Sequence, residues 1–526
     1  MTAADEGSAF AATNMPNYLL GIDVGTTGCK ALLVAEDGRV AASTTSEYPM
    51  STPQPLWAEQ DPEDWWQVAR RSIARVLTEA KATGSDVAGI GLTGQMHGLV
   101  LLDAHGDVLR PCIMWNDQRT AAQCEAITRQ LGVKQLLELT GNVVLPGFTA
   151  PKIAWVRDNE PQVYSRIASV LLPKDYLRYR LTGALVSDVS DASGTSLLDV
   201  ARRTWSSEMV RALSINANWL PQLTESPEVS AHVSKQAAAE TRLVAGTPVV
   251  GGAGDQAAQA VGTGTVVEGI VSVTIGTSGV VFVSSDKYRC EPQGRLHAFC
   301  HAVPGKWHLM GVMLAAGGSF RWFRDTFCER EREEAKRAGR DPYDLLTEAA
   351  SKIPAGSEGL LFLPYLSGER TPYSDANARG VFFGLSLRHT RAHLARAVLE
   401  GVTFGLRDSL ELVRALGIPT REVRATGGGA SSGLWRQIVA DIFASPIATV
   451  NVTEGAAYGA ALLAGAGAGV YASVPEACQK VIRTRQQVSP GRDAQTYAAL
   501  YERYRALYPA LKNEFAALAD TLAKIS

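Results

Sequence analysis

The sequence contains the same short pattern twice, once in its first half and once in its second. In each copy an apolar strand, a turn bounded by glycines and a second apolar strand follow one another, over residues 18–34 and 270–283. A strand-like segment that runs into a polar loop with glycines follows each copy, at residues 87–98 and 422–432. A supersecondary unit repeated at this distance predicts two domains of similar architecture.

Helices with clear start signals lie between these strands. Asp61 and Pro62 open one helix, and Thr390 caps another. Helices that alternate with strands and hairpins predict an α/β protein with mixed sheets. The 526 residues are too many for one core and suit two domains. We expect an N-terminal extension at residues 1–16, a first domain at 17–262 and a second domain at 263–526.

Charge and composition exclude several kinds of partner. The formal net charge is −2, which gives no electrostatic reason to expect nucleic acid or a membrane surface. The uncharged stretch 455–474 consists mostly of Ala and Gly, so we interpret it as a buried helix followed by a glycine-rich loop. Seven scattered cysteines without a CxxC pair, and an N-terminus without signal-peptide character, predict a cytoplasmic protein with reduced thiols.

The two glycine-bounded turns are candidate phosphate-binding loops. Glycines leave the backbone N–H groups unobstructed, and Thr and Ser hydroxyls add donors. One such turn alone is usually just a hairpin turn, but two in matched positions predict a nucleotide held between two domains. The sequence has no GxxxxGK[ST] motif, so a Walker-type site is excluded. The turn residues that we expect to contact the nucleotide are Thr26, Thr27, Gly276, Thr277 and Ser278.

Two aspartates stand where these strands end. Asp23 precedes the first turn and either caps that turn or orients Mg²⁺ beside the phosphates of the nucleotide. Asp255 follows the glycine-rich strand 248–254 and precedes a helix, so it either caps the helix or acts as a general base. As a base it would take the proton of a substrate hydroxyl that attacks a γ-phosphate. We expect Asp23 and Asp255 to form the metal site and Asp255 to be catalytic.

A polar loop after residues 87–94 is the candidate sugar site. It places an imidazole and an amide at the end of a strand, where they can form hydrogen bonds with a polyol. A lone histidine is more often structural, but an aromatic side chain and further amides lie nearby in the chain. The residues that we expect to contact the sugar are Gln95, Met96, His97, Trp57 and Asn116.

Several motifs together resemble the FGGY family of carbohydrate kinases, over about residues 18–510. They are DVGTTG at 23–28, GFTAPKIAW at 147–155, GTSG at 276–279, GVFFGL at 380–385 and GGG at 427–429. The resemblance implies two ribonuclease-H-like domains of the actin and sugar kinase type, with mixed sheets flanked by helices and a cleft between the domains. It also implies ATP as the phosphoryl donor and Mg²⁺ as the cofactor.

The resemblance assigns roles to individual residues. Asp255 matches the catalytic base of the family, and Asp23 matches the carboxylate associated with Mg²⁺ and phosphate. Met96 and His97 match sugar-contacting positions. Gln256 stands beside the base, where many relatives carry Asn, and we expect it near the sugar. Positions that match nucleotide contacts are Thr277, Gly428 and Gly429, and we add Gly318 and Ser432 from neighbouring glycine-rich segments.

Further motifs bear on the substrate. LWAEQDP at 56–62 and LPYLSGERTP at 363–372 resemble the family members that act on D-xylulose, and they imply ATP-dependent phosphorylation at O5. A homodimer is possible by the same resemblance. The alternatives are a family member that acts on gluconate, ribulose, fuculose or glycerol, or a regulator that binds sugar and nucleotide without catalysis. The presence of Asp255 argues against the regulator. A chaperone-type ATPase is disfavoured because nothing after the second domain resembles a peptide-binding module.

Overall fold

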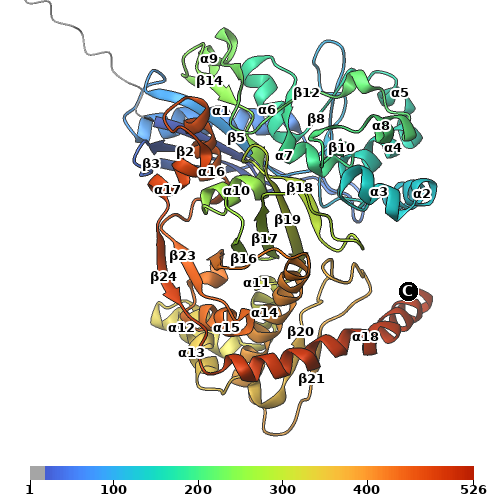
Figure 1. The fold of residues 1–526 in the computed structure, drawn as a ribbon, viewed down its shortest axis with the longest axis vertical. Coiled ribbons are helices and arrows are strands. Elements are labelled where there is room, and N and C mark those ends of the chain that lie inside the picture. Colours follow the sequence, from blue (N-terminus) through green and yellow to red (C-terminus); the bar gives the residue numbers. More distant parts are fainter. Residues whose placement is uncertain (1–17, 526) are drawn as a thin grey trace, which may run out of the picture.

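The computed structural model describes residues 18–525, which contain two seven-stranded sheets in two halves of the molecule (Figure 1). The first sheet has the order β13-β14-β5-β1-β2-β3, with β15 paired to β5 beside this path, and the second has the order β18-β19-β17-β16-β22-β23-β24. The strands of the first sheet are β1 (Tyr18–Val24), β2 (Gly28–Ala35), β3 (Val40–Glu47), β5 (Val87–Gly94), β13 (Val229–His232), β14 (Pro248–Val250) and β15 (Ala253–Gly254). Those of the second are β16 (Ile270–Ile275), β17 (Gly279–Ser285), β18 (His297–Cys300), β19 (Trp307–Met313), β22 (Glu422–Thr426), β23 (Ile447–Val450) and β24 (Thr484–Val488).

The repeated pattern in the sequence forms the centre of both sheets. β1 pairs with β2 antiparallel and with β5 parallel, and β16 pairs with β17 antiparallel and with β22 parallel. Each turn is closed by a backbone hydrogen bond of 3.0 Å, donated by Gly25 to Gly28 in the first turn and by Gly276 to Ser278 in the second. The predicted α/β class with mixed sheets is confirmed.

Helices cover both sheets, and the two helix starts that the sequence predicts are confirmed. The Asp61 carboxylate accepts a hydrogen bond from the Glu63 backbone at the start of the first helix, and Thr390 is the N-cap of the long helix in the second half. Helices of the first half are α1 (Pro62–Glu79), α2 (Ala121–Leu131), α3 (Val133–Thr140), α4 (Thr149–Asn159), α5 (Pro161–Tyr164), α6 (Pro173–Thr182), α7 (Val189–Ala192), α8 (Ser207–Ala212), α9 (Lys235–Thr241) and α10 (Asp255–Gly262). Later helices are α11 (Gly317–Phe327), α12 (Glu329–Ala338), α13 (Pro342–Ser351), α14 (Arg391–Ala415), α15 (Gly433–Phe443), α16 (Gly455–Gly467), α17 (Val474–Val481) and α18 (Ala494–Ile525).

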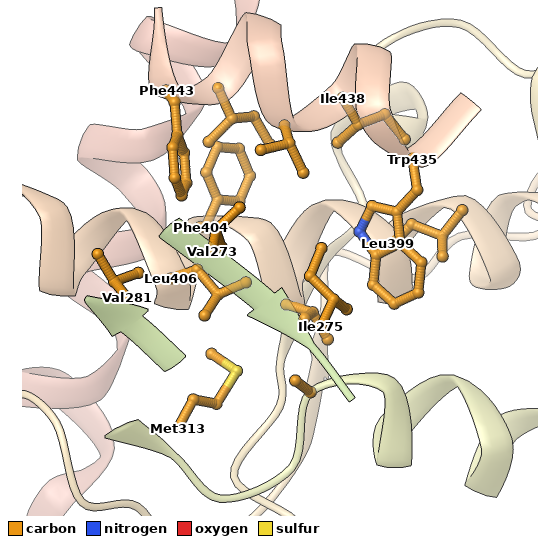
Figure 2. Close-up of a cluster of buried hydrophobic side chains, with 14 of the residues drawn as sticks. Val273, Ile275, Val281, Met313, Leu399, Phe404, Leu406, Trp435, Ile438 and Phe443 are labelled. Carbon is orange, nitrogen blue, oxygen red and sulfur yellow. The ribbon is translucent and has the colours of Figure 1, made fainter. Parts of the chain in front are cut away.

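The core of the second half forms where α14 meets the sheet. Figure 2 shows side chains from β16, β17, α14 and α15 in one cluster, with Val273, Val281, Phe404 and Trp435 among them. All four are at most 3% exposed, so this half buries its own apolar face without help from the first.

One late segment of the chain returns to the first half. α16 packs against β1, β5 and α10 (Figure 1), and its residues share a buried cluster with Leu19, Leu32 and Val250. The predicted buried helix in 455–474 is confirmed. The contact is a close backbone approach, because a Cβ on Gly91 would lie 1.8 Å from the Ala460 carbonyl oxygen. The helix can approach the sheet this closely only because Gly91 has no side chain.

The other expectations about organisation fall partly outside the structure. The proposed extension at residues 1–16 lies outside the described residues. The proposed domain boundary at 262/263 stays a prediction; it falls between α10 and β16, while α16 and α17 cross back to the first half. Within residues 18–525, no helix combines the length and apolar character needed to cross a membrane.

The packing of α16 on the first sheet can be tested at Gly91. We expect Gly91→Ala to destabilise the protein by at least about 2 kcal/mol, because a methyl group there overlaps backbone atoms that cannot rotate away. Urea denaturation followed by circular dichroism measures the change. Gly433→Ala is the control, because its Cβ would meet only a side-chain nitrogen of Arg436 at 3.8 Å. Equal stability of the two variants would contradict this packing.

Candidate active site

Two aspartates face each other across the end of β5. In the parallel pairing of β1 with β5, Asp23 lies opposite Thr93 and Val24 opposite Gly94. In the pairing of β15 with β5, Gly254 also lies opposite Gly94, and α10 begins at the next residue, Asp255. The strand register therefore brings the two carboxylates to one edge of the sheet from opposite sides.

Burial raises the pKa of both carboxylates toward neutral pH, so each is more basic than an ordinary aspartate. Burial raises the pKa of Asp255 to about 7, with a further contribution from the charge of Asp23, while hydrogen bonds from Gln256 act in the opposite direction. Burial raises the pKa of Asp23 to about 6, opposed by the positive charge of Lys30. Lys30 is itself paired with Glu454 at 2.5 Å. The site thus holds two carboxylates that exchange protons close to physiological pH.

Neither aspartate serves mainly as a local cap. The N-cap of α10 is Gly254, and Asp255 is the first helical residue. In the described part of the chain the Asp23 carboxylate accepts no hydrogen bond from the turn, and its Oδ1 is buried without a partner. A buried carboxylate oxygen without a donor is costly, and a cation would satisfy it.

The predicted sugar loop holds a neutral, oriented histidine. His97 has a φ of 70°, and its Nδ1 donates to the Gly194 carbonyl at 2.6 Å, which leaves Nε2 as an acceptor. Burial holds the pKa of His97 well below its usual range, and the positive charge of Lys152 adds to this effect. The ring stacks on Phe148 with centroids 4.6 Å apart. The imidazole is therefore fixed and uncharged.

Met96 of this loop lies beside the residue that precedes Asp255. Its side chain is 5% exposed, and a Cβ on Gly254 would lie 3.0 Å from the Met96 Cγ. A Cβ on Gly194 would lie 3.1 Å from the Met96 Cε. Met96 thus lies beside Gly254, which precedes Asp255, and beside Gly194, which accepts the hydrogen bond from His97. Contact of Met96 and His97 with a sugar stays a prediction. Gln256 follows Asp255 in the first turn of α10.

Three other predicted sugar contacts have their main interactions elsewhere. Gln95 donates to Gln60 at 3.0 Å and belongs to a network that reaches the first turn. Trp57 and Asn116 line a separate hollow of about 470 Å³ formed by residues 52–58. The guanidinium of Arg119 covers one face of Trp57 at 3.7 Å. Contact of Gln95, Trp57 and Asn116 with a sugar stays a prediction. Arg119 covers a face of the Trp57 ring on which a sugar would stack.

The second half holds a cavity of about 500 Å³ beside its glycine-bounded turn. Five segments converge on it: the 276–279 turn, the start of α11, α13, the loop after β22 and the start of α15. Predicted nucleotide residues that line it are Gly276, Thr277, Gly318, Gly428, Gly429 and Ser432. The sequence analysis missed α13, which contributes Tyr343, Asp344 and Thr347 to the wall. No motif marks that helix, so only the tertiary structure places it there.

The remaining turn residues lie outside this cavity. Ser278 is exposed next to Thr277 and is absent from the cavity lining. Thr26 and Thr27 belong to the turn beside Asp23 in the first half. The Thr26 hydroxyl accepts a hydrogen bond from the Trp115 indole at 2.9 Å, and the Thr26 carbonyl accepts one from Gln60 at 2.8 Å. Their role at the phosphates stays a prediction.

A buried lysine, which the sequence analysis did not identify as functional, supports the sugar loop. Lys152 of α4 is fully buried and donates to the carbonyls of His97 at 2.9 Å and Gly147 at 2.8 Å. Burial lowers the pKa of Lys152 to about 7. A single lysine within the mostly apolar run 147–156 was the sequence feature that could have indicated this role. Lys152 fixes the backbone that carries His97.

A complete protein-ligated metal centre does not occur among residues 18–525, since no three His, Cys, Asp or Glu side chains gather to hold an ion. Mg²⁺ usually binds through one or two carboxylates together with substrate phosphates and water. Asp23, with its unpartnered oxygen, and Asp255 form such a pair of carboxylates. The donor set therefore fits a magnesium ion that arrives with a nucleotide.

Two α/β halves of this kind occur in solved two-domain sugar kinases. A solved xyloylose kinase from Brucella ovis superposes with a TM-score of 0.86 and 41% identity, over 94% of this chain and 99% of that one. A ligand-bound xylulose kinase from Lactobacillus acidophilus superposes with a TM-score of 0.89 and 28% identity, over 95% of this chain and 99% of that one. The predicted actin and sugar kinase type of fold is confirmed.

The chain belongs to the FGGY family of carbohydrate kinases. The N-terminal domain of the family matches residues 18–262, and the C-terminal domain matches residues 271–468. The xylulose kinase of Escherichia coli K12 is 43% identical over 94% of this chain and 99% of its own length. The predicted resemblance is confirmed, and membership makes the protein a carbohydrate kinase that uses ATP.

The cavity of the second half can be tested for ATP at Gly428. A Cβ at this position would meet no atom within 4 Å, so a side chain there would enter the cavity without disturbing the fold. We expect Gly428→Leu to keep the thermal midpoint and to weaken ATP binding by at least about tenfold, measured by calorimetry. Unchanged ATP affinity in a folded Gly428→Leu protein would exclude this cavity as the nucleotide site.

Proposed function

We propose that this protein transfers the γ-phosphoryl group of ATP to O5 of D-xylulose, giving D-xylulose 5-phosphate and ADP. One observation carries the proposal: Asp255, a carboxylate with a pKa near neutrality, stands at the end of β5 beside Met96, within a family of carbohydrate kinases. The printed name of the Escherichia coli relative, xylulose kinase, supports the choice of sugar.

Asp255 is the general base of this reaction. Its carboxylate takes the proton of the O5 hydroxyl while O5 forms a bond to the γ-phosphorus, and the bond to the bridging oxygen of ADP breaks. A base with a pKa near the working pH is both unprotonated often enough and basic enough to accept the proton. After the product departs, Asp255 releases the proton to solvent.

The sugar-binding groups orient the hydroxyl toward that base. His97 presents Nε2 as an acceptor because its Nδ1 proton is committed to Gly194. Met96 supplies an apolar contact between His97 and Asp255, and Gln256 offers an amide beside the base. A fixed acceptor on one side and a base on the other hold the sugar in one orientation, which accounts for much of the rate gain in reactions of this type.

The nucleotide occupies the cavity of the second half with its phosphates directed to the first. The 276–279 turn and the glycines at 428 and 429 supply backbone N–H groups. Asp23 and Asp255 are the residues that would hold Mg²⁺, and the buried, unpartnered Oδ1 of Asp23 supports this. When bound, Mg²⁺ neutralises charge on the phosphate oxygens.

Gluconate is the second candidate substrate. A gluconokinase from Bacillus subtilis is 34% identical over 96% of this chain and 98% of its own length, so the same scaffold supports a sugar acid in a relative. Related sugars differ by only a few hydrogen bonds, which a pocket can exchange without altering the ATP site. We further propose a cytoplasmic homodimer; the seven free cysteines fit a reducing compartment.

A substrate panel tests the proposal. We expect D-xylulose to stimulate release of ADP from ATP more than gluconate, ribulose, fuculose or glycerol does, measured at equal concentrations by a coupled ADP assay. Stimulation by gluconate or glycerol alone would exclude D-xylulose as the substrate. A protein that released no ADP with any of these compounds would be the non-catalytic regulator instead.

The pH dependence of the rate tests the base. Because Asp255 must be unprotonated, kcat/KM for D-xylulose should rise with pH through an acid limb well above the ordinary aspartate pKa of about 4. The raised pKa of Asp255, about 7, and its coupling to Asp23 place the midpoint near neutrality. Initial rates between pH 5 and pH 9, at constant ionic strength, measure this midpoint. A limb centred near pH 4 would contradict the assigned base.

A further inference from the structure

Five charged side chains are buried beside the loop that precedes Asp255. Lys174, Asp175 and Arg178 come from α6, Asp188 ends β9 (Val186–Asp188), and Asp191 lies on α7; none has measurable exposure. The Lys174 Nζ lies 2.5 Å from Asp175 Oδ1, 2.9 Å from Asp188 Oδ1 and 3.4 Å from Asp191 Oδ2. One ammonium group thus ties together three segments of the chain.

Stability alone does not explain such a cluster. Removing five charges from water is costly, and well-packed apolar side chains commonly serve stability as well or better. With two cations and three carboxylates the cluster would carry excess negative charge. Burial raises the pKa of Asp191 well above its usual range; the charge of Lys174 opposes this shift, and the charges of Asp175, Asp188 and Asp255 add to it. A proton on Asp191 makes the cluster neutral.

The cluster connects to the base through one serine. Asp188 Oδ2 accepts hydrogen bonds from the Ser190 hydroxyl at 2.5 Å, from the Ser190 backbone at 2.8 Å and from the Ser226 hydroxyl at 2.9 Å. The Ser190 Oγ in turn accepts a hydrogen bond from the Gly254 backbone at 3.2 Å. Gly254 immediately precedes Asp255, so a continuous chain of contacts runs from Lys174 to the backbone of the base.

The loop before Asp255 needs external anchors because it is rich in glycine. Gly252 has a φ of 69°, and a Cβ there would lie 2.1 Å from the Leu92 carbonyl oxygen. Glycines permit this path but do not enforce it. Arg178 donates to the Gly251 carbonyl, and the Gly252 backbone donates to the Ser226 carbonyl at 2.9 Å. The cluster and its neighbours therefore fix a loop that the sequence leaves free.

The same segment also reaches the sugar side of the site. The short helix η1 (Ser193–Thr195) follows α7 directly, and its Gly194 carbonyl accepts the hydrogen bond from the His97 Nδ1 at 2.6 Å. Residues 188–195 thus contact the backbone of the base at one end and the imidazole at the other. A displacement of this segment would change the distance between the two groups.

We propose that the chain Lys174–Asp188–Ser190 is a positioning device that sets the place of Asp255 relative to the bound sugar. The inference rests on the proposed role of Asp255 as the base. Ser190 is a positioning residue that acts through the Gly254 backbone, and Asp188 and Lys174 hold the Ser190 hydroxyl in the orientation that accepts from Gly254. Neither the sugar nor ATP needs to contact Lys174, Asp188 or Ser190.

Ser190→Ala tests this device. We expect kcat to fall by about 10- to 100-fold while the KM values for sugar and ATP stay within about threefold, because only the reacting geometry changes. Ser357→Ala is the matched control. Ser357 donates at 2.9 Å to Glu400, which is paired with Arg396, so this variant also removes a serine from a buried ion pair, but in the second half. Its kcat should stay at the wild-type value.

A double-mutant cycle separates positioning from general damage. If Ser190 acts through Asp255, the variant that combines Ser190→Ala with Asp255→Asn should be no slower than Asp255→Asn alone. Additive losses, or an unchanged kcat in Ser190→Ala, would overturn the proposal. If Ser190→Ala does not fold, Ser226→Ala, which removes only one donor to Asp188, should show a smaller loss of kcat with the same pattern. Near-normal activity of Asp255→Asn would instead contradict the proposed base.

Discussion

The parallel pairing of β5 with a strand on each side is the constraint on which the site depends. β1 and β15 both end opposite Gly94, and each delivers an aspartate to the same sheet edge. Parallel strands present their carboxyl ends together, so the two carboxylates approach without any strained loop. Burial raises both pKa values toward neutrality, and the charge of Asp23 raises that of Asp255 further, as the proposed base and cation site require.

The duplicated hairpin extends this arrangement to a second substrate. The turn after β1 lies beside the aspartates, and the turn after β16 lines a cavity with glycines from α11 and from the loop after β22. α16 joins the halves, because it lies between β23 and β24 of the second sheet in the chain but packs on the first sheet. In the proposed function, one half binds the sugar and the other binds the nucleotide, within a chain that belongs to the carbohydrate kinases.

Local signals in the sequence predicted much of this structure. The turns, the Asp61 and Thr390 caps and the strand-to-helix position of Asp255 depend on neighbouring residues, and the structure has each of them. Contacts between distant segments were not predictable: α13 beside the cavity of the second half, Arg119 over Trp57 and the cluster around Lys174. Buried charges are hard to predict from sequence for a physical reason. A lysine is usually exposed to solvent, and the burial of Lys174 is explained only by the carboxylates that pair with it from distant parts of the chain.

The central claim is that Asp255 takes the proton from the sugar hydroxyl during phosphoryl transfer. Asp255→Asn keeps the size of the side chain and removes its basicity. Single-turnover transfer from ATP to D-xylulose, measured together with calorimetric binding of each substrate, tests the claim most directly. We expect both affinities to stay within about threefold and transfer to fall by at least about 10²-fold. Near-normal transfer by a folded Asp255→Asn protein would contradict the account.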